Sequence, residues 1–498
     1  MTLHGAVQYI LKIRQCRHPE CARYRQPLRP EAEGALALPR SEYGLDVLAL
    51  IGALRYSEHR SVPEIHAVLL DREVEVSERN VTHLLHRYEE LLALRLTDAT
   101  RLREKLRAQG QVILALDGLQ PDVGHEVLWV LRDVLSGEVL LARALLGGGE
   151  AELTPLIQEV KEALGEGLPI IGVISDGQHA IRHTIAQVLP GVPHQLCQFH
   201  YLREAARPVF EADRHAKVQL KRELRGVRKL ERSLEVRTDL PARVLLDYCL
   251  AVRGALTDDG RPPLAASGLK LRRRIQEVEG SLARVHGEKG AQEPVDPELR
   301  RLHVHLQRAL ERSDAGWPEI DRAYRLVSQA AQVLQNAEEG TAQQVEGRFE
   351  TVLQRIEREA NRNGSLHDAL RHFLKVTASY RSHLFHTYSL PGLPRTNNDL
   401  EQFFGAARYH ERRIAGRKVA SPSTVIRGQV RLVAAFGTRL QPPVGPDLRP
   451  RCLTAWRHLR AGLEARHEAR RQQLRFRRSP DQYLAALEAR LLKPPLPS

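Results

Sequence analysis

Short apolar runs alternate with turn residues between positions 111 and 201, and this pattern predicts an α/β domain. The runs have the length and β-branched content of strands, whereas the segments between the later runs have the 3.6-residue spacing of helices. Three strands, then helix, strand, helix and strand, is the order of a mixed sheet. The expected strands are 112–118 (VILALDG), 127–134 (VLWVLRDV), 139–146 (VLLARALL), 169–176 (PIIGVISD) and 194–201 (HQLCQFHY), and the expected helices are 150–164 and 178–189.

Apolar residues between positions 41 and 94 recur at helical spacing and predict three helices. The second begins at Ser61 with a capping box and a proline in its first turn, and the third begins at Ser77. A short helix, a turn and a longer helix with a polar start are typical of a DNA-binding helix-turn-helix, although a plain three-helix bundle has the same pattern. The polar residues at the start of the third helix are Arg79, Asn80, Thr82 and His83.

The long middle of the chain is almost wholly helical and highly charged, unlike the strand-rich segment before it. The simplest account is a helical domain inserted in the α/β domain, and the alternative is an independent helical domain that follows it. The expected parts are an N-terminal segment with a small Cys/His motif (1–40), a helix-turn-helix domain (41–100), the first part of the α/β core (108–205), the all-helical insertion (206–390), the last part of the core (391–440) and a basic C-terminal region of helices or tail (441–498).

The charge of the chain narrows its expected partners. The formal net charge is +14, and of 75 basic residues 11 are lysine and 64 arginine. Guanidinium groups bind phosphates through paired hydrogen bonds, so nucleic acid is the expected partner, although a genome rich in arginine codons would give the same composition. One basic cluster spans 457–478, and another contains Arg408, Arg412, Arg413, Arg417, Lys418, Arg427 and Arg431.

Neither a membrane protein nor a disulfide-rich one is expected. The chain has no run of about 18 apolar residues and no clear signal peptide, and its five cysteines are few and scattered. These features predict a reduced, cytoplasmic protein. Cys16 and Cys21, and separately Cys197 and His200, are candidate zinc ligands, but each pair is an incomplete set. Reduced thiols are the simpler interpretation, with Cys197 and His200 buried beside the sheet.

Two expected strands end in an aspartate that precedes glycine, Asp117 and Asp176. If these strands are neighbours, both carboxylates lie at one edge of the sheet, where open α/β sheets place their sites. Their mutual repulsion predicts a divalent cation, and oxygen ligands suit Mg²⁺ or Mn²⁺. A third carboxylate would allow two ions roughly 3.5–4 Å apart. Asp176 is also a good N-cap for the helix that follows it, and Asp122 and Asp133 are further acids of this region.

Three segments, in this order along the chain, resemble the DDE transposases of the Mutator type, including their bacterial insertion-sequence members. The segments are ISDGQHAI (174–181), LPGVPHQLCQFHYLREA (189–205) and RTNNDLEQFFG (395–405), and the resemblance spans roughly 111–418. It implies an RNase H-like fold with a helical insertion between the second and third catalytic acids. It also implies that Asp117, Asp176 and Glu401 hold two Mg²⁺ or Mn²⁺ ions, and that Cys197 and His200 are the family's Cys-x-x-His.

Taken without the resemblance, the segment around Glu401 is simply the start of a helix. Thr396, Asn397 or Asn398 would cap it, and acids in its first turn would face the positive end of the helix dipole. Glu401 would then be a solvated acid, and Asp399 competes with it for the catalytic role. Phe403 and Phe404 are expected to pack on one face of this helix, with Glu401 pointing elsewhere.

The resulting expectation is a DNA transposase that hydrolyses phosphodiesters at transposon ends and joins the freed 3′-hydroxyl to target DNA. Arg79, Asn80, Thr82 and His83 would read base edges, and Arg408, Arg412, Arg413, Arg417 and Lys418 would hold phosphates. Two double-stranded DNA ends must be paired, so at least a homodimer is expected on DNA, associated with the bacterial nucleoid. A catalytically inactive DNA-binding or regulatory protein and an RNase H-like nuclease without strand transfer are the alternatives.

Overall fold

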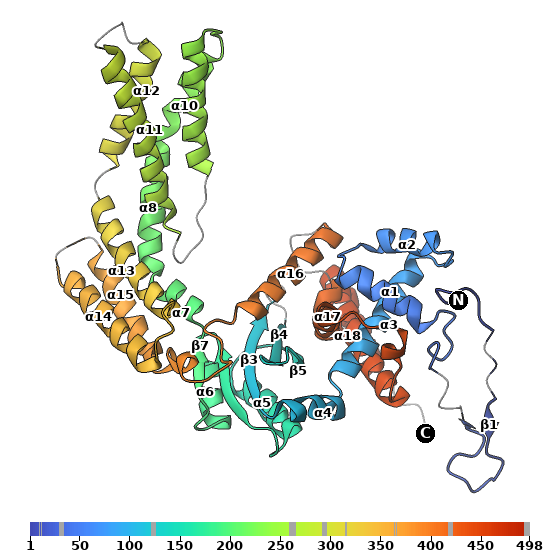
Figure 1. The fold of residues 1–498 in the computed structure, drawn as a ribbon. Helices are drawn as coiled ribbons and strands as arrows, with labels where there is room; N and C mark the ends of the chain where they lie inside the picture. The colour runs from blue at the N-terminus through green and yellow to red at the C-terminus, as the bar shows by residue number, and fades with distance from the viewer. Residues whose placement is uncertain are drawn as a thin grey trace. The chain divides into compact units, whose positions relative to one another are not determined.

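The computed structural model describes residues 1–8, 10, 12–28, 34–120, 126–257, 265–290, 296–313, 316–362, 364, 366–416 and 422–492. The chain divides into two compact units (Figure 1). The first consists of Met1–His194 and Asn397–Ser498, and the second consists of Gln195–Thr396. The second unit is therefore one continuous segment between two parts of the first. None of the described helices is long and apolar enough to cross a membrane.

A five-stranded mixed sheet forms the α/β part of the chain, in the order β5-β4-β3-β6-β7. β3 pairs antiparallel with β4 and parallel with β6, and β4 pairs antiparallel with β5. This mixed arrangement confirms the α/β prediction. The strands are β3 (Val112–Leu119), β4 (Val127–Asp133), β5 (Val139–Leu145), β6 (Ile170–Ser175) and β7 (His194–Leu196).

One expected strand is wrong over most of its length. Only His194–Leu196 of the segment 194–201 is extended, and Gln198–Ala205 forms helix α7. Tyr201, Leu202 and Ala205 are buried on one face of α7, which is the spacing of a helix rather than a strand. In an apolar segment as short as this one, periodicity alone does not separate the two structures.

The two faces of the sheet carry different kinds of residues. Val112, Leu114 and Leu116 of β3 lie in one apolar core with residues of α5 (Glu150–Leu164) and α6 (His179–Val188). Since side chains alternate along a strand, Ile113, Ala115 and Asp117 face the opposite side. On that side α17 (Pro422–Leu440) approaches so closely that a Cβ at Gly428 would overlap Leu128 of β4.

The N-terminal helices form as expected but do not build their core alone. Ser61 and Glu64 form the capping box of α2, and the Ser77 side chain accepts a hydrogen bond from the main chain of α3. Ala434 of α17 and Trp456 of α18 lie in the same core as these helices, although both come from segments expected to be separate. The helices are α1 (Leu45–Tyr56), α2 (Val62–Asp71), α3 (Glu78–Leu96), α4 (Ala99–Gln109) and α18 (Leu453–Arg478).

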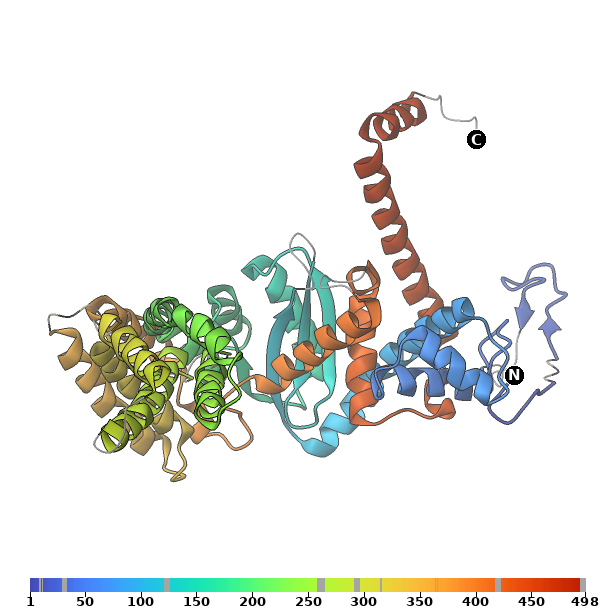
Figure 2. The ribbon, with the colours of Figure 1, turned by 90° about the horizontal axis from the view of Figure 1, so that it is seen from above.

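The two ends of the chain form secondary structure in which few side chains are buried. At the N-terminal end, β1 (Arg14–Gln15) and β2 (Pro27–Leu28) form a two-stranded antiparallel sheet. At the C-terminal end, Trp456 and Leu463 are the buried residues of α18, and α19 (Pro480–Leu491) has none. Figure 2 shows α18 and α19 in red, leading away from the α1–α3 helices. The C-terminal region is thus helical and mostly exposed to solvent.

The second unit is all-helical and has its own core. Trp317, Phe349 and Phe373 are among its fully buried side chains, and the Tyr201 and Thr377 hydroxyls share a hydrogen bond of 2.7 Å. Its helices are α7 (Gln198–Ala205), α8 (Arg207–Glu223), α9 (Val227–Leu234), α10 (Leu240–Thr257), α11 (Ser267–Gly290), α12 (Pro297–Arg312), α13 (Trp317–Gln335), α14 (Ala342–Ala360) and α15 (His367–Tyr380). The helical character expected for the middle of the chain is confirmed.

Candidate active site

The pairing of β3 with β6 brings Asp117 and Asp176 to the same edge of the sheet. The two strands are parallel, and Ala115 lies beside Ile174 in their register. Continuing the register by two residues places Asp117 beside Asp176, just past the end of β6 at Ser175. The condition that the sequence left open, that these strands are neighbours, is therefore met.

Helix α16 (Asn398–Ala415) starts at this edge of the sheet (Figure 1). The buried side chain of Asn397 donates a hydrogen bond to the carbonyl of Leu116, the residue before Asp117. Arg132 of β4 forms an ion pair with Asp399 in the first turn of α16, with the guanidinium nitrogen 3.1 Å from the carboxylate oxygen. These two contacts fix the first turn of α16 next to the end of β3.

Asp117 is an acid in a poorly solvated place. Asp117 is 9% exposed, and one of its carboxylate oxygens accepts a hydrogen bond of 2.8 Å from the Gly118 amide. Burial raises the pKa of Asp117 to about 7, and the negative charges of Asp176 and Glu401 add to the increase. The Gly118 hydrogen bond and the charge of Arg408 lower this pKa but do not offset the increase. The three predicted acids are thus close enough to influence one another.

The local contacts of Asp176 contradict the interpretation of this residue as a helix cap. The N-cap position of α6 belongs to Gln178, and the helix has no side-chain cap. Asp176 instead accepts two hydrogen bonds from Gln178, one from the main-chain amide (3.1 Å) and one from the side-chain amide (2.8 Å). These bonds hold the half-buried carboxylate at the end of β6, two residues before the N-cap of α6.

The competition between Asp399 and Glu401 is decided by the neighbours of each residue. Asp399 pairs with Arg132, and its side chain is 78% exposed. Glu401 is half-buried, and its charge acts on Asp117. Phe403 and Phe404 are both buried, as expected for the apolar face of this helix. Glu401, rather than Asp399, is the acid of α16 that faces the carboxylates of the sheet.

Asp133 and Asp122 are the other two candidate acids of this region, and Asp133 is not part of the group formed by Asp117, Asp176 and Glu401. Asp133 is fully buried, and its carboxylate accepts hydrogen bonds from the amides of Ile113 and Ser136 and from the Gln109 side chain. It fastens the turn between β4 and β5 and is a structural residue. Asp122 lies outside the described residues.

The donor set at this edge suits a hard divalent cation. All three side chains, Asp117, Asp176 and Glu401, offer carboxylate oxygens, which Mg²⁺ and Mn²⁺ prefer. Deprotonation of Asp117 adds a further negative charge to a buried place beside two other acids, as its raised pKa shows. A divalent cation would offset that repulsion, so these three carboxylates fit a site for Mg²⁺ or Mn²⁺.

The two cysteine motifs differ in their burial. Cys16 and Cys21 are free thiols, and hydrogen bonds from the Arg23 main-chain amide and from the Cys16 side chain lower the pKa of Cys21. No group of three potential metal ligands among the described residues includes either of them. Cys197 is a buried free thiol at the start of α7, and His200 is half-buried within that helix.

The residues expected to contact DNA are on the surface where the structure describes them. Arg79, Asn80 and His83 are exposed in the first two turns of α3, and Thr82 is partly exposed. On α16, the exposed basic residues Arg408, Arg412 and Arg413 follow Glu401. Arg417 and Lys418 lie outside the described residues.

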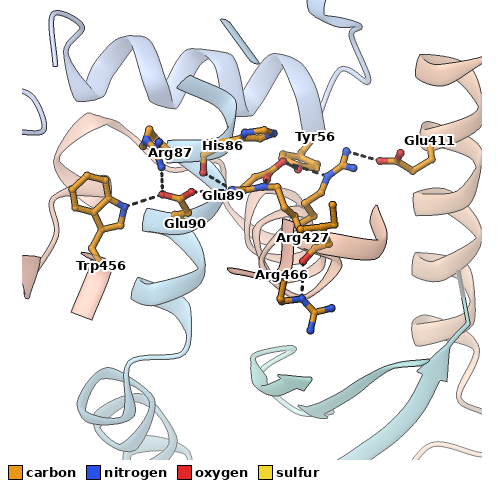
Figure 3. A network of polar contacts seen from close by, with 11 residues as sticks. Tyr56, His86, Arg87, Glu89, Glu90, Glu411, Arg427, Trp456 and Arg466 are labelled. Atoms are coloured by element: carbon orange, nitrogen blue, oxygen red, sulfur yellow. Dashed lines mark hydrogen bonds and ion pairs between the residues drawn. The ribbon is translucent and has the colours of Figure 1, made fainter. Parts of the chain in front are cut away.

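Two arginines that the sequence placed in the late basic cluster are buried in an ion-pair network instead (Figure 3). The Arg427 guanidinium contacts Glu89 at 3.0 Å and Glu90 at 3.2 Å. Arg431 contacts Glu89 at 3.3 Å and Glu411 of α16 at 2.5 Å. Both arginines neutralise two acids that α3 buries, so they are not exposed like Arg408, Arg412 and Arg413 of the same basic cluster.

This network also fixes the far part of α16. Arg431 joins Glu89 of α3 to Glu411, which lies ten residues after Glu401 on the same helix. The Tyr56 hydroxyl donates to Glu89 (2.8 Å), and the Trp456 indole donates to Glu90 (3.0 Å). α16 is therefore held at its start by β3 and β4 and further along by α3 and α17.

Sequence reasoning missed the residues that position α16. The sequence predicts Asn397 only as a possible helix cap, whereas its side chain donates a hydrogen bond to the Leu116 carbonyl of β3. Arg132 offered a signal, because a charged residue in the apolar run VLWVLRDV needs a partner. Arg427 and Arg431 lie four residues apart among Ile426, Val430 and Val433, a spacing that places both arginines on one side of a largely apolar helix.

Comparison with models of known protein families finds no match for this chain. No curated protein matches its sequence either.

Proposed function

We propose that the chain is a metal-dependent DNA transposase of the DDE type, with an RNase H-like core. The observation that supports this most directly is the convergence of three acids from distant parts of the chain, since Asp176 and Glu401 both raise the pKa of the buried Asp117. The mixed sheet, the acids at its edge and the inserted helical unit are consistent with the sequence resemblance.

Asp117, Asp176 and Glu401 would hold two Mg²⁺ or Mn²⁺ ions. Bound there, such ions lower the pKa of the attacking water or hydroxyl and stabilise the leaving 3′ oxygen. The chain's own part is to keep the three carboxylates in place, through the rigid strands β3 and β6 and the anchored first turn of α16. The first step hydrolyses a phosphodiester at a transposon end, and in the second the freed 3′-hydroxyl attacks a target phosphodiester.

Arg408 is suited to bind the phosphate of the DNA strand. It follows Glu401 by seven residues, two turns of α16, and so lies on the same side of the helix. Its charge acts on Asp117, and its side chain is exposed. A guanidinium in this position would attract the anionic strand to the carboxylates, which would otherwise repel it.

Binding of double-stranded DNA would use two kinds of surface. Arg79, Asn80, Thr82 and His83 at the start of α3 would read base edges, as in a helix-turn-helix. Arg412 and Arg413 of α16 and the exposed arginines of α18 would contact phosphates and make affinity fall steeply with salt. Because two transposon ends must be joined, the active form would be a dimer or a larger oligomer on DNA.

The experiment uses the DNA that flanks the gene as substrate. The full-length protein should nick this DNA and join it to a target plasmid with Mg²⁺, and EDTA should stop both reactions. Asp117→Asn, Asp176→Asn and Glu401→Gln should each reduce cleavage more than about 10³-fold and leave DNA affinity intact.

Asp399→Asn is the matched control, because Asp399 is an acid of the same helical turn that pairs with Arg132 instead. It should cut nearly like the parent, because the amide oxygen of the introduced asparagine can still accept a hydrogen bond from Arg132. Cleavage without joined product would indicate a nuclease, and DNA binding without metal-dependent cleavage would indicate a regulatory protein. Parental cleavage by any of the three variants at the proposed site would contradict the assignment.

A further inference from the structure

Two histidines and a glutamate gather on the surface where α5 and α6 begin. Glu150 is the first residue of α5, and His179 and His183 are one turn apart on α6. The potential ligand atoms of these three side chains all lie within 4.8 Å of one another. His183 Nδ1 is 3.8 Å from Glu150 Oε1, and the two imidazole ring centres are 4.5 Å apart.

The local structure explains why these side chains meet. Residues four apart on a helix lie on the same side, so His179 and His183 point the same way. Ile181, Ile185 and Val188 bury the other side of α6 against the core that it shares with α5. That packing holds the start of α5, and with it Glu150, beside the two histidines.

The donor chemistry differs from that of the acids at the edge of the sheet. Two imidazoles and one carboxylate suit borderline ions such as Zn²⁺ and Ni²⁺, whereas Mg²⁺ prefers oxygen ligands alone. Ligands around a tetrahedral zinc ion lie roughly 3.4 Å apart. Small rotations of these exposed side chains are therefore sufficient to bring all three onto one ion.

We propose that Glu150, His179 and His183 form a site for a divalent transition-metal ion of the Zn²⁺ class, with a fourth position open to water. The ion joins the first turn of α5 to the first turn of α6. His179 follows directly after Gln178, whose main-chain and side-chain amides hold Asp176. The site does not depend on the function proposed for Asp117, because it shares no ligand with the three acids.

The test counts bound zinc on the full-length protein after it has been stripped with a chelator. Millimolar Mg²⁺ is present throughout, so that Zn²⁺ does not titrate the oxygen ligands at the sheet edge. In competition with a chromophoric chelator, the parent should bind one more Zn²⁺ than His179→Asn or His183→Asn. Glu150→Gln should weaken this binding at least about tenfold. Amide hydrogen exchange in the first turns of α5 and α6 should slow when Zn²⁺ is added.

His467→Asn is the control, because it removes an exposed histidine of α18 that belongs to no such group. It should bind as many zinc ions as the parent, with the same affinity. The difference between parent and variants separates this site from any binding by the cysteines, which all of these proteins share. Equal stoichiometry and affinity in the parent and both histidine variants would overturn the proposal.

Discussion

Two groups of buried carboxylates in the first unit have opposite electrostatic surroundings. Glu89 is 1% exposed and Asp117 is 9% exposed. Burial raises the pKa of both side chains. At Glu89 the charges of Arg431 and Arg427 reverse this effect and bring the pKa below its ordinary value, whereas at Asp117 two further acids add to it and the pKa reaches about 7. The charge of the Glu89 carboxylate is thus neutralised by arginines, whereas that of the Asp117 carboxylate is left largely uncompensated.

The difference separates acids whose charge the chain neutralises from acids whose charge it leaves largely uncompensated. The chain itself supplies the cations for Glu89 and Glu90, and their network joins α3, α16, α17 and α18 (Figure 3). Around Asp117 the chain supplies only partial compensation, from the Gly118 amide and Arg408. A group of acids arranged in this way has a free-energy cost that cation binding would relieve.

The largest effect on stability is expected from breaking the neutralised network. Arg431→Met leaves Glu89 and Glu411 without a shared partner in a poorly solvated place, and should destabilise the first unit by about 3–5 kcal/mol. Urea denaturation followed by circular dichroism measures this loss. Adding Glu89→Gln to the variant should restore part of it, and Arg413→Met, which removes an exposed arginine, should cost less than about 1 kcal/mol. A loss as small as that of the control would show that the network contributes little.

Removing the charge of Asp117 should stabilise the folded protein, whereas removing Arg431 destabilises it. Because the folded-state pKa of Asp117 is about 7, above the ordinary carboxyl value of 3.8, the folded protein loses stability as the pH rises from about 4 to about 7. In EDTA at about pH 8, Asp117→Asn should be more stable than the parent by about 2–4 kcal/mol, and this difference should vanish below about pH 4. Urea titrations at several pH values measure it. A difference that does not change with pH would contradict the raised pKa.

Metal binding should stabilise the parent through this site. At a Mg²⁺ concentration of about 100 times Kd, the free energy of unfolding should rise by about 2.7 kcal/mol. Asp176→Asn should lose most of this gain, since it removes one of the three carboxylates, whereas Arg413→Met should retain it. Unfolding curves with and without Mg²⁺ provide the measurement, and an equal response of parent and Asp176→Asn would exclude this metal site.

The smallest effect is expected at Asp399. Its ion pair with Arg132 has one highly exposed partner, so Asp399→Asn should change stability by less than about 1 kcal/mol. Glu401→Gln, two residues away, should be nearly as harmless to stability and yet abolish cleavage. This pair of variants tests whether the two acids of one helical turn differ in role, and equal cleavage by both would remove the distinction.

The sequence determined what depends on local spacing. Strands β3 to β6 follow from short apolar runs, the capping box of α2 from Ser61 and Glu64, and the helix 150–164 from its apolar period. The sequence also indicates the three candidate acids: Asp117 and Asp176 each end an apolar strand, and the resemblance implies Glu401. The strands, the capping box and the helix can be predicted from the sequence because each depends on residues within a few positions of one another.

Only the tertiary structure decided which charges meet. Asp117 and Glu401 are 284 positions apart in the chain, and their proximity depends on the β3–β6 pairing and on the contact of Asn397 with β3. Arg427 and Arg431 have the same composition as the exposed arginines of α16, but the packing of α17 against α3 directs them to Glu89 and Glu90. The pKa of a carboxyl group is set by burial and by charges within a few ångströms, and neither is fixed until distant segments pack.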